Sequence, residues 1–496
     1  MTFTAPFFIC SEIIKGKYPS ILTMKTKTLS IMKKFFLFFF AVAALTFVGC
    51  SDDDSDDGPE PMAETCNDGI MNNGETGVDC GGPNCQPCMD AVDPPTCSDG
   101  IQNGNETGVD CGGSCGTPCP GDTVEVDDNI TSDTTWSADF VYQLNGRIAV
   151  ESGATLTIEA GTIIKGNAGQ GENATALLVA RGATLNAMGT AAAPIIMTST
   201  ADNIEPGMIE SPNLDVNFSG LWGGLIVLGN APISVDANDE LTVSDGVAQI
   251  EGIPANDPNG AYGGTDPMDN SGTITYVSVR HGGTNIGSGN EINGITFGGV
   301  GNGTTVNHLE VVANVDDGVE FFGGTVDVNN IIVWAQGDDA VDVDQAFSGT
   351  LDNVVVQQGP TSDHALEIDG PEGAATGSYT LVNATLLGDE DGGAIGDFRS
   401  GATGANNNIL VQNFPAGADV ELDNAGVADN FTDGSLSFMT WEVVLADGVT
   451  LGDIFDDTTG TTTGFGDFAT AVTTPTVGAD TSEFSGWSIA GIALGF

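Results

Sequence analysis

The fold is decided by short apolar runs that return along the chain: Leu309-Glu-Val-Val312, Ile331-Ile-Val-Trp334, Val354-Val-Val356 and Ile409-Leu-Val411. They recur roughly every 22 to 30 residues and are separated by glycine, asparagine and aspartate. A repeat of this length is typical of one coil of a parallel β-helix, in which each coil stacks its apolar side chains on those of its neighbours. The pattern predicts an all-β chain whose main domain, residues 121–429, is a right-handed parallel β-helix.

Earlier coils are expected around residues 150–156, 179–185 and 227–233, and the abundance of turn formers supports them. The chain holds 70 glycines and few lysine, arginine or glutamate residues, which argues against helices and for many tight turns. Residues 430–496 are rich in phenylalanine and tryptophan. Because an open solenoid end exposes its core and an unpaired strand edge, we expect this segment to form a C-terminal cap.

The charge distribution limits the classes of partner. The formal net charge is −58, and of the 69 acidic and 11 basic residues only one acid but six bases lie in residues 1–49. Nothing in the remaining chain could neutralise phosphates, so nucleic acid and anionic membrane surfaces are excluded as partners. Divalent cations, neutral glycans and basic protein surfaces stay possible, and 40% hydrophobic residues exclude a disordered acidic polymer.

The N-terminal segment predicts export. Lys33 and Lys34 precede an apolar run, residues 35–48, which is followed by Gly49 and Cys50. This is the pattern of a secretory signal peptide, and the run is shorter than the ~20 residues that span a bilayer. Its end resembles the lipobox of bacterial lipoproteins. The resemblance implies that residues 1–49 are a leader and signal peptide and that Cys50 is the lipidation site, with several acyl chains forming a stable anchor.

Residues 50–63 contain the run Ser-Asp-Asp-Asp-Ser-Asp-Asp-Gly and are expected to form an acidic tether, since such a run cannot bury anything. The run resembles the acidic export tag of Bacteroidetes lipoproteins. That resemblance implies a lipid anchor in the outer membrane and exposure on the cell surface.

Two cysteine-rich repeats, residues 66–88 and 97–119, follow each other with a period of 31 residues and define a module region at 64–120. Each repeat is too small to fold on its own core, and an exported chain lies in an oxidising compartment, so two disulfides per repeat are expected. Four cysteines allow three connectivities, and zinc is the alternative, although paired Cys-x-x-Cys motifs are absent. The expected disulfide cysteines are Cys66, Cys80, Cys85, Cys88, Cys97, Cys111, Cys115 and Cys119.

Oxygen-bearing side chains recur at the same positions of both repeats, as calcium sites require. They resemble cysteine-rich calcium-type repeats of bacterial surface proteins, and the alternative is that they are turn residues without a metal. In either case the modules are expected to act as a stalk. The candidate Ca²⁺ ligands are Asp68, Asn72, Glu75 and Asp79 in the first repeat and Asp99, Asn103, Glu106 and Asp110 in the second.

The predicted coils also align acidic residues. Neighbouring coils lie ~4.8 Å apart, so one column is expected to hold Asp317, Asp339 and His364. A parallel column is expected to hold Glu320, Asp342 and Glu367, which alternate with apolar neighbours and therefore face away from the core, as a Ca²⁺ site or a solvated face. Carboxylates this close bind a cation, share a proton or repel one another.

A catalytic interpretation is also open. Asn-x-Asp, Asp-Asp and His on successive coils are similar to the active-site strand of polygalacturonase-like glycoside hydrolases. The resemblance implies that Asp338 or Asp339 is the general acid, and that Asp317 and the other member activate water across ~6.5–9.5 Å. The family's Gly-His-Gly is replaced around His364, and its Arg-x-Lys clamp is reduced to Arg399.

Over residues 130–420 the chain resembles uncharacterised Bacteroidetes solenoid lipoproteins and, more loosely, a leptospiral outer-membrane lipoprotein family. The resemblance is carried by residues 154–165, 221–230 and 280–285 and implies fold and placement but no activity. The expected function is non-enzymatic binding of glycans or surface proteins, for example in adhesion. The alternatives are a surface polysaccharide hydrolase or lyase, and a structural surface component.

Overall fold

The computed structural model describes residues 66, 71, 74–83, 85–86, 88, 97–98, 100–113, 115, 117, 119–171, 174–238, 241–244, 246–251, 253–254, 256–287 and 290–496. The chain divides into two compact units, residues 1–91 and 92–496. The predicted signal peptide, the tether and the lipidation site Cys50 lie outside the described residues, as do the candidate ligands Asp68, Asn72 and Asp99.

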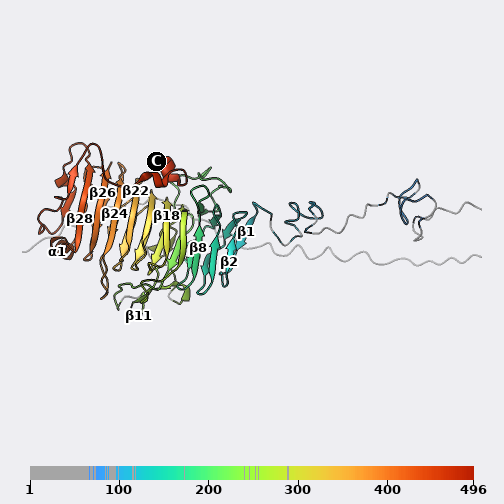
Figure 1. The fold of residues 1–496 in the computed structure, drawn as a ribbon, viewed down its shortest axis with the longest axis horizontal. Coiled ribbons are helices and arrows are strands. Elements are labelled where there is room, and N and C mark those ends of the chain that lie inside the picture. Colours follow the sequence, from blue (N-terminus) through green and yellow to red (C-terminus); the bar gives the residue numbers. More distant parts are fainter. Residues whose placement is uncertain are drawn as a thin grey trace, which may run out of the picture. The chain divides into compact units, whose positions relative to one another are not determined.

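The second unit contains two long sheets of parallel strands that stack coil upon coil (Figure 1). This confirms the predicted parallel β-helix. The 15-stranded sheet consists of β1 (Thr123–Val126), β2 (Thr134–Trp136), β3 (Val141–Leu144), β5 (Thr155–Ile158), β6 (Ile163–Gly166), β8 (Thr184–Met188), β9 (Ile195–Ser199), β14 (Gly272–Arg280), β18 (Thr305–Val312), β20 (Val328–Trp334), β22 (Thr350–Gln357), β24 (Tyr379–Leu387), β26 (Gly404–Gln412), β28 (Leu436–Val444) and β30 (Ala469–Ala471). The 10-stranded sheet consists of β4 (Arg147–Val150), β7 (Ala176–Val179), β10 (Leu225–Leu228), β17 (Ile295–Gly298), β19 (Val319–Phe322), β21 (Val341–Asp344), β23 (His364–Ile368), β25 (Ala394–Phe398), β27 (Val420–Leu422) and β29 (Phe455–Asp457).

Short antiparallel strands and short helices lie outside the two long sheets. An insertion after β10 carries a three-stranded antiparallel sheet, and a second antiparallel pair follows β14. These strands are β11 (Thr242–Ser244), β12 (Val247–Gln249), β13 (Ala261–Tyr262), β15 (Asn285–Gly287) and β16 (Asn290–Glu291). The helices are η2 (Pro258–Gly260), α1 (Ala425–Asp433), η3 (Leu451–Asp453), η4 (Thr481–Phe484) and α2 (Ile489–Leu494).

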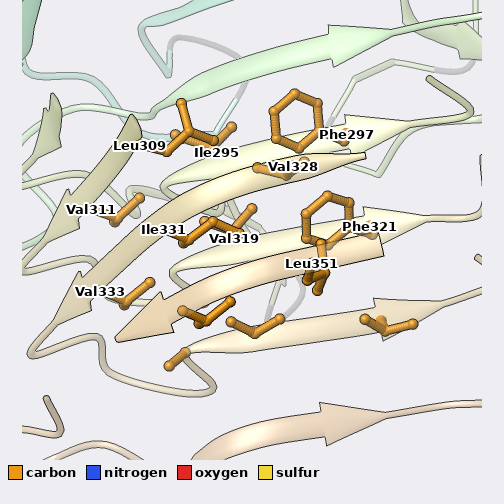
Figure 2. Packing of buried hydrophobic residues seen from close by; sticks show 14 of the residues in the cluster. Ile295, Phe297, Leu309, Val311, Val319, Phe321, Val328, Ile331, Val333 and Leu351 are labelled. Carbon is orange, nitrogen blue, oxygen red and sulfur yellow. The ribbon is translucent and has the colours of Figure 1, made fainter. Parts of the chain in front are cut away.

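The core lies between the two sheets and is built from identical positions of successive coils. Leu309 pairs with Ile331, and Val311 pairs with Val333, so that each apolar side chain lies on its counterpart (Figure 2). From the facing sheet, the Phe321 ring lies against the ring of Phe297 with centroids 5.4 Å apart. The buried apolar surface of every coil therefore continues that of the previous coil.

Each long strand of the 15-stranded sheet from β14 onward bends once, at a residue with a left-handed backbone. These residues have φ between 50° and 63° and are Tyr276, His308, Asn330, Asn353, Asn383, Asn408 and Thr440. The bends lie in register because the residues on either side of each one pair across neighbouring strands. Asparagine tolerates this conformation better than most residues, which explains its use at four successive bends.

The solenoid does not end at residue 429: β28, β29 and β30 continue both sheets. Aromatic rings fill this last part of the core, with Phe438 lying 5.0 Å from Phe468 and 5.7 Å from Trp441 between ring centroids. The remaining tail, residues 478–496, does not cover the open end. Its buried Phe484 and Trp487 pack on the outer face of β18, β20 and β22.

Both cysteine repeats form the predicted disulfides, with the first cysteine bonded to the third and the second to the fourth. This connectivity engages all eight cysteines, and no thiolate remains in the repeats for the alternative zinc site. The bonds are Cys66–Cys85, Cys80–Cys88, Cys97–Cys115 and Cys111–Cys119.

Candidate functional site

The first candidate is a line of carboxylates on the outer face of the 10-stranded sheet, which we call the carboxylate column. Glu320 pairs with Asp342, and Asp342 with Glu367, as the sequence spacing predicted. The column continues through three further coils that the sequence reasoning missed. Its complete membership is Glu320, Asp342, Glu367, Asp397, Glu421 and Asp456.

The burial of the carboxylate column changes along its length. Glu320, Asp342 and Glu367 point away from the core but are only 5–7% exposed, so the expectation of a solvated face is wrong for them. Glu320 lies beneath the insertion that follows β10. There it lines a cavity of about 200 Å³ together with Tyr262 and other side chains from the segment 235–262. At the other end of the column Asp456 is exposed. Residue spacing could not predict that an insertion from an earlier part of the chain covers this face.

This burial changes the protonation of the carboxyl groups. Burial, reinforced by neighbouring carboxylates, raises the pKa of Asp317, Glu320 and Asp342 well above the ordinary range. For the same reason the pKa of Asp344, which follows in β21, is about 8. Burial also raises the pKa of Asp397 to about 6.

Arg399 neutralises the middle of the carboxylate column. Its guanidinium contacts Glu367 and lies 2.6 Å from an oxygen of Asp369 and 3.9 Å from one of Asp397. The resemblance to polygalacturonases suggested a substrate clamp at this arginine. Its three carboxylate partners instead give it a local role in balancing charge.

The predicted second column, Asp317, Asp339 and His364, is also formed. Oδ1 of Asp317 accepts a hydrogen bond from the backbone N–H of Asp339 at 2.9 Å. Oδ1 of Asp339 likewise accepts the backbone N–H of His364 at 2.7 Å and lies 2.8 Å from its Nδ1. Burial lowers the pKa of His364, but the hydrogen bond to Asp339 and the surrounding carboxylates outweigh it and raise the pKa overall.

Asp317 and Asp339 therefore connect neighbouring coils, because each accepts a hydrogen bond from a backbone N–H of the next coil. Asp338 is the most exposed of these aspartates, and the partial desolvation of its carboxyl, together with the charges of Asp339 and Asp363, raises its pKa. One oxygen each of Asp316, Asp317 and Asp338 lies within 4.8 Å of the others. Oxygens this close can share a proton or hold a cation.

In the cysteine modules, carboxylates among the described candidate ligands accept hydrogen bonds from backbone N–H groups. Oε2 of Glu106 accepts the N–H of Asn103 at 3.0 Å, and Oε2 of Glu75 accepts the N–H of Asp79 at 3.3 Å. Asp110 accepts the N–H of Gly100 at 2.8 Å. These contacts stabilise tight turns, which is the alternative to a calcium site.

A second candidate was not predicted: a row of amides at the bends of the 15-stranded sheet, Asn330, Asn353, Asn383 and Asn408, which we call the asparagine column. Nδ2 of Asn353 donates to Oδ1 of Asn330 at 2.6 Å, and Asn330 donates to Asn307 at 2.7 Å. Asn408 donates to Asn383 in the same way. The recurrence of asparagine at intervals close to the coil length is the sequence signal that could have found it.

Three members of the asparagine column, Asn330, Asn353 and Asn383, form the floor of a groove of about 750 Å³, the asparagine groove. The C-terminal tail forms its wall, held by a hydrogen bond of 2.6 Å from the N–H of Asp480 to Oδ1 of Asn353. The groove is lined by Asn307, His308, Asn329, Asn330, Asp352, Asn353, Asn383, Gly478, Asp480 and Glu483. This lining offers many hydrogen-bond donors and acceptors, three acidic groups and no lysine or arginine.

The comparison with protein families agrees with this architecture. The family model described as a pectate-lyase like β-helix domain matches residues 128–490, which is well over half of the chain. No curated protein and no solved structure matches this chain. Within the described residues, no helix combines the length and the apolar character needed to cross a membrane. The chain belongs to the family of pectate-lyase like β-helix domains.

Proposed function

We propose that this protein is a non-enzymatic, surface-anchored β-helix that binds neutral glycans in the asparagine groove, for example in adhesion to a glycan-bearing surface. The observation that carries the proposal is the groove itself. Its volume of about 750 Å³ lies in the range of sites for small ligands, and amide side chains form its floor.

Asparagine amides match the hydroxyl groups of sugars. Each amide has two N–H donors and a carbonyl with two lone pairs. Asn330 uses one donor toward Asn307 and one acceptor site toward Asn353, which leaves one of each for a ligand. Asn383 donates to Asp352 and accepts from Asn408, so it also keeps one donor and one acceptor site, whereas both N–H groups of Asn353 are engaged by Asn330 and Asp480. Because coils repeat every ~4.8 Å, Asn330 and Asn383 present these groups two coils apart along the floor.

The charges of the groove favour neutral over anionic glycans. Asp352, Asp480 and Glu483 line it, and none of the lining residues is a lysine or arginine. His308 also lines it, and burial lowers the pKa of this histidine, which favours its neutral form. The whole chain carries a formal net charge of −58, so a uronate would approach against a repulsive field. We therefore expect uncharged oligosaccharides to bind and polygalacturonate to be rejected.

The proposed placement rests on the N-terminal sequence. Acylation at Cys50 would anchor the chain in the outer membrane, and the tether and the disulfide-bonded modules would present the solenoid at the cell surface. The resemblance to Bacteroidetes surface lipoproteins supports this arrangement. Metabolic labelling with a palmitate analogue, lost in Cys50→Ala, tests the anchor.

The binding function is tested with a glycan array probed by the chain from residue 51 onward. Asn330→Ala is expected to lose at least tenfold in affinity for the neutral glycans that bind. Asn408→Ala is the matched control, because Asn408 has the same left-handed bend, with φ 62° against 60°, and the same type of amide contact but does not line the groove. Both variants are expected to cost about 1 kcal/mol of stability through backbone strain.

The proposal fails if the wild-type chain binds no neutral glycan, or if Asn408→Ala weakens binding as much as Asn330→Ala. The non-enzymatic part has its own test on the same glycans. Release of reducing ends by the wild type, abolished in Asp339→Asn, would establish the hydrolase alternative instead.

A further inference from the structure

A second site lies apart from the asparagine groove, on the 10-stranded sheet. Asp317 and Glu320 come from one coil and Asp342 from the next, and one carboxylate oxygen of each lies within 4.8 Å of the others. All three side chains are buried, with exposed fractions of 6%, 5% and 7%. Three negative charges so close together and so far from water require a compensating positive charge or protons.

The described basic side chains do not supply that charge. Five lysine and arginine residues follow Cys50, and each has its partners elsewhere. Arg147 pairs with Asp257, Lys165 donates to the carbonyls of Asp202 and Ile204, Arg181 donates to that of Gly263, Arg280 pairs with Glu310, and Arg399 contacts Glu367, Asp369 and Asp397. The three histidines also have other partners, which are the carbonyl of Phe218 for His281, Glu483 for His308 and Asp339 for His364.

Two buried oxygen atoms, one in the carboxylate cluster and one in a side chain that contacts it, have no hydrogen-bond partner. Oδ1 of Asp342 is buried and has no hydrogen-bond partner. Oδ1 of Asn293 is also buried without a partner, while the Nδ2 of the same side chain donates to Glu320. Asn293 is 3% exposed, so its carbonyl oxygen has lost solvent without gaining a protein donor. A buried acceptor that lacks a donor is the type of ligand that a metal ion uses.

We propose that Asp317, Glu320 and Asp342 bind one Ca²⁺ ion that joins two successive coils of the solenoid. Calcium takes carboxylate and amide oxygens at 2.3–2.6 Å, so two ligands on opposite sides of the ion lie about 4.8 Å apart, as the cluster allows. The cavity of about 200 Å³ that Glu320 lines leaves room for the water ligands that complete the shell. Glu367, which the sequence suggested as a ligand, contacts Arg399 and is not a member of this cluster.

The experiment compares calcium binding by the chain from residue 51 onward and two variants, after treatment with a chelator. Isothermal titration with CaCl₂ is expected to show one ion fewer for Asp342→Asn than for the wild type. Asp456→Asn, in the exposed end of the same carboxylate column, is the matched control and should bind as many ions as the wild type. Because only the difference is counted, ions bound by the cysteine modules do not affect the result.

Thermal melts give a second measure. The melting temperature of the wild type and of Asp456→Asn should rise with the logarithm of the Ca²⁺ concentration, and the corresponding slope of Asp342→Asn should be smaller. Equal stoichiometry in all three proteins overturns the proposal. The proposal is also overturned if the melting temperature of the wild type does not change with Ca²⁺ but rises at acid pH. In that case shared protons, and not a metal ion, compensate the charge of the cluster.

A third readout does not depend on the folding of Asp342→Asn. Tyr262 lines the same cavity as Glu320, so its ring should sensitise the luminescence of Tb³⁺ bound at the cluster. The wild-type emission should fall on addition of Ca²⁺, and Tyr262→Phe should lower the emission while retaining the ion. Emission that is unchanged in Tyr262→Phe and unaffected by Ca²⁺ would count against the site.

Discussion

Replacing Asp344 by asparagine should stabilise the protein at alkaline pH and leave it unchanged at acid pH. Asp344 lines the cavity of about 200 Å³ together with Glu251, Glu320 and Glu372. Burial, followed by the neighbouring carboxylates, raises its pKa from 3.8 to about 8. The folded chain therefore holds this proton more tightly than the unfolded chain. The resulting stabilisation is complete below pH ~4 and is lost as the pH rises through about 8.

The size of the effect follows from that shift. A rise in pKa from 3.8 to about 8 corresponds to about 6 kcal/mol, at about 1.4 kcal/mol for each unit. Asp344 keeps partial access to solvent, so we take about half of this, roughly 3 kcal/mol, as the expected gain for Asp344→Asn at pH 9.

Urea unfolding followed by tryptophan fluorescence, at pH 4.5 and pH 9 in the presence of a chelator, measures both free energies of unfolding. The chelator removes any ion that would compete with the proton. Asp456→Asn is the control, since it removes an exposed carboxylate from the same sheet and should show no pH-dependent gain. The reasoning is refuted if Asp344→Asn is no more stable than the wild type at pH 9, or if its advantage is equally large at pH 4.5.

Two further predictions concern packing. Glu310→Ala should cost about 3–5 kcal/mol, because Glu310 and Arg280 form a buried ion pair at 3.2 Å and the arginine would be left without its partner. It should also expose the C-terminal tail to limited proteolysis, since Glu310 accepts the N–H of Ala490 at 2.8 Å; an uncut tail would contradict this. Phe321→Ala should cost about 3–5 kcal/mol in urea unfolding, because its ring lies 5.4 Å from that of Phe297 and 4.7 Å from that of Phe347; a loss below about 1 kcal/mol would show that the core closes around the gap.

Much of the coil register could be predicted from residue spacing. In a parallel β-helix, equivalent residues of successive coils lie directly above one another, so the interval from Glu320 to Asp342 to Glu367 predicts neighbours in space. The alternation of apolar and polar residues also predicts that these side chains point away from the core, because successive residues of a strand face opposite sides. Both predictions are confirmed.

The extent of the columns was harder to predict. Asp397, Glu421 and Asp456 continue the carboxylate column, but intervals that vary from coil to coil hide them among many acidic residues. The asparagine column was missed for a related reason. Asparagine is common in turns of any fold, so its recurrence at Asn330 and Asn353 has meaning only once the bends are known to lie in register.

The sequence by itself determined the parallel β-helix, the two disulfides of each module and the outward direction of the acidic side chains. These properties depend on sequence repeats and on the alternation of apolar and polar residues, both of which can be recognised within one or two repeats. Only the tertiary structure decided that Glu320 is buried beneath an insertion, that Arg399 removes Glu367 from the free carboxylates, and that the tail closes the asparagine groove. Each of these depends on a segment that folds onto a coil from elsewhere in the chain, and the periodicity of the coil carries no information about what covers it.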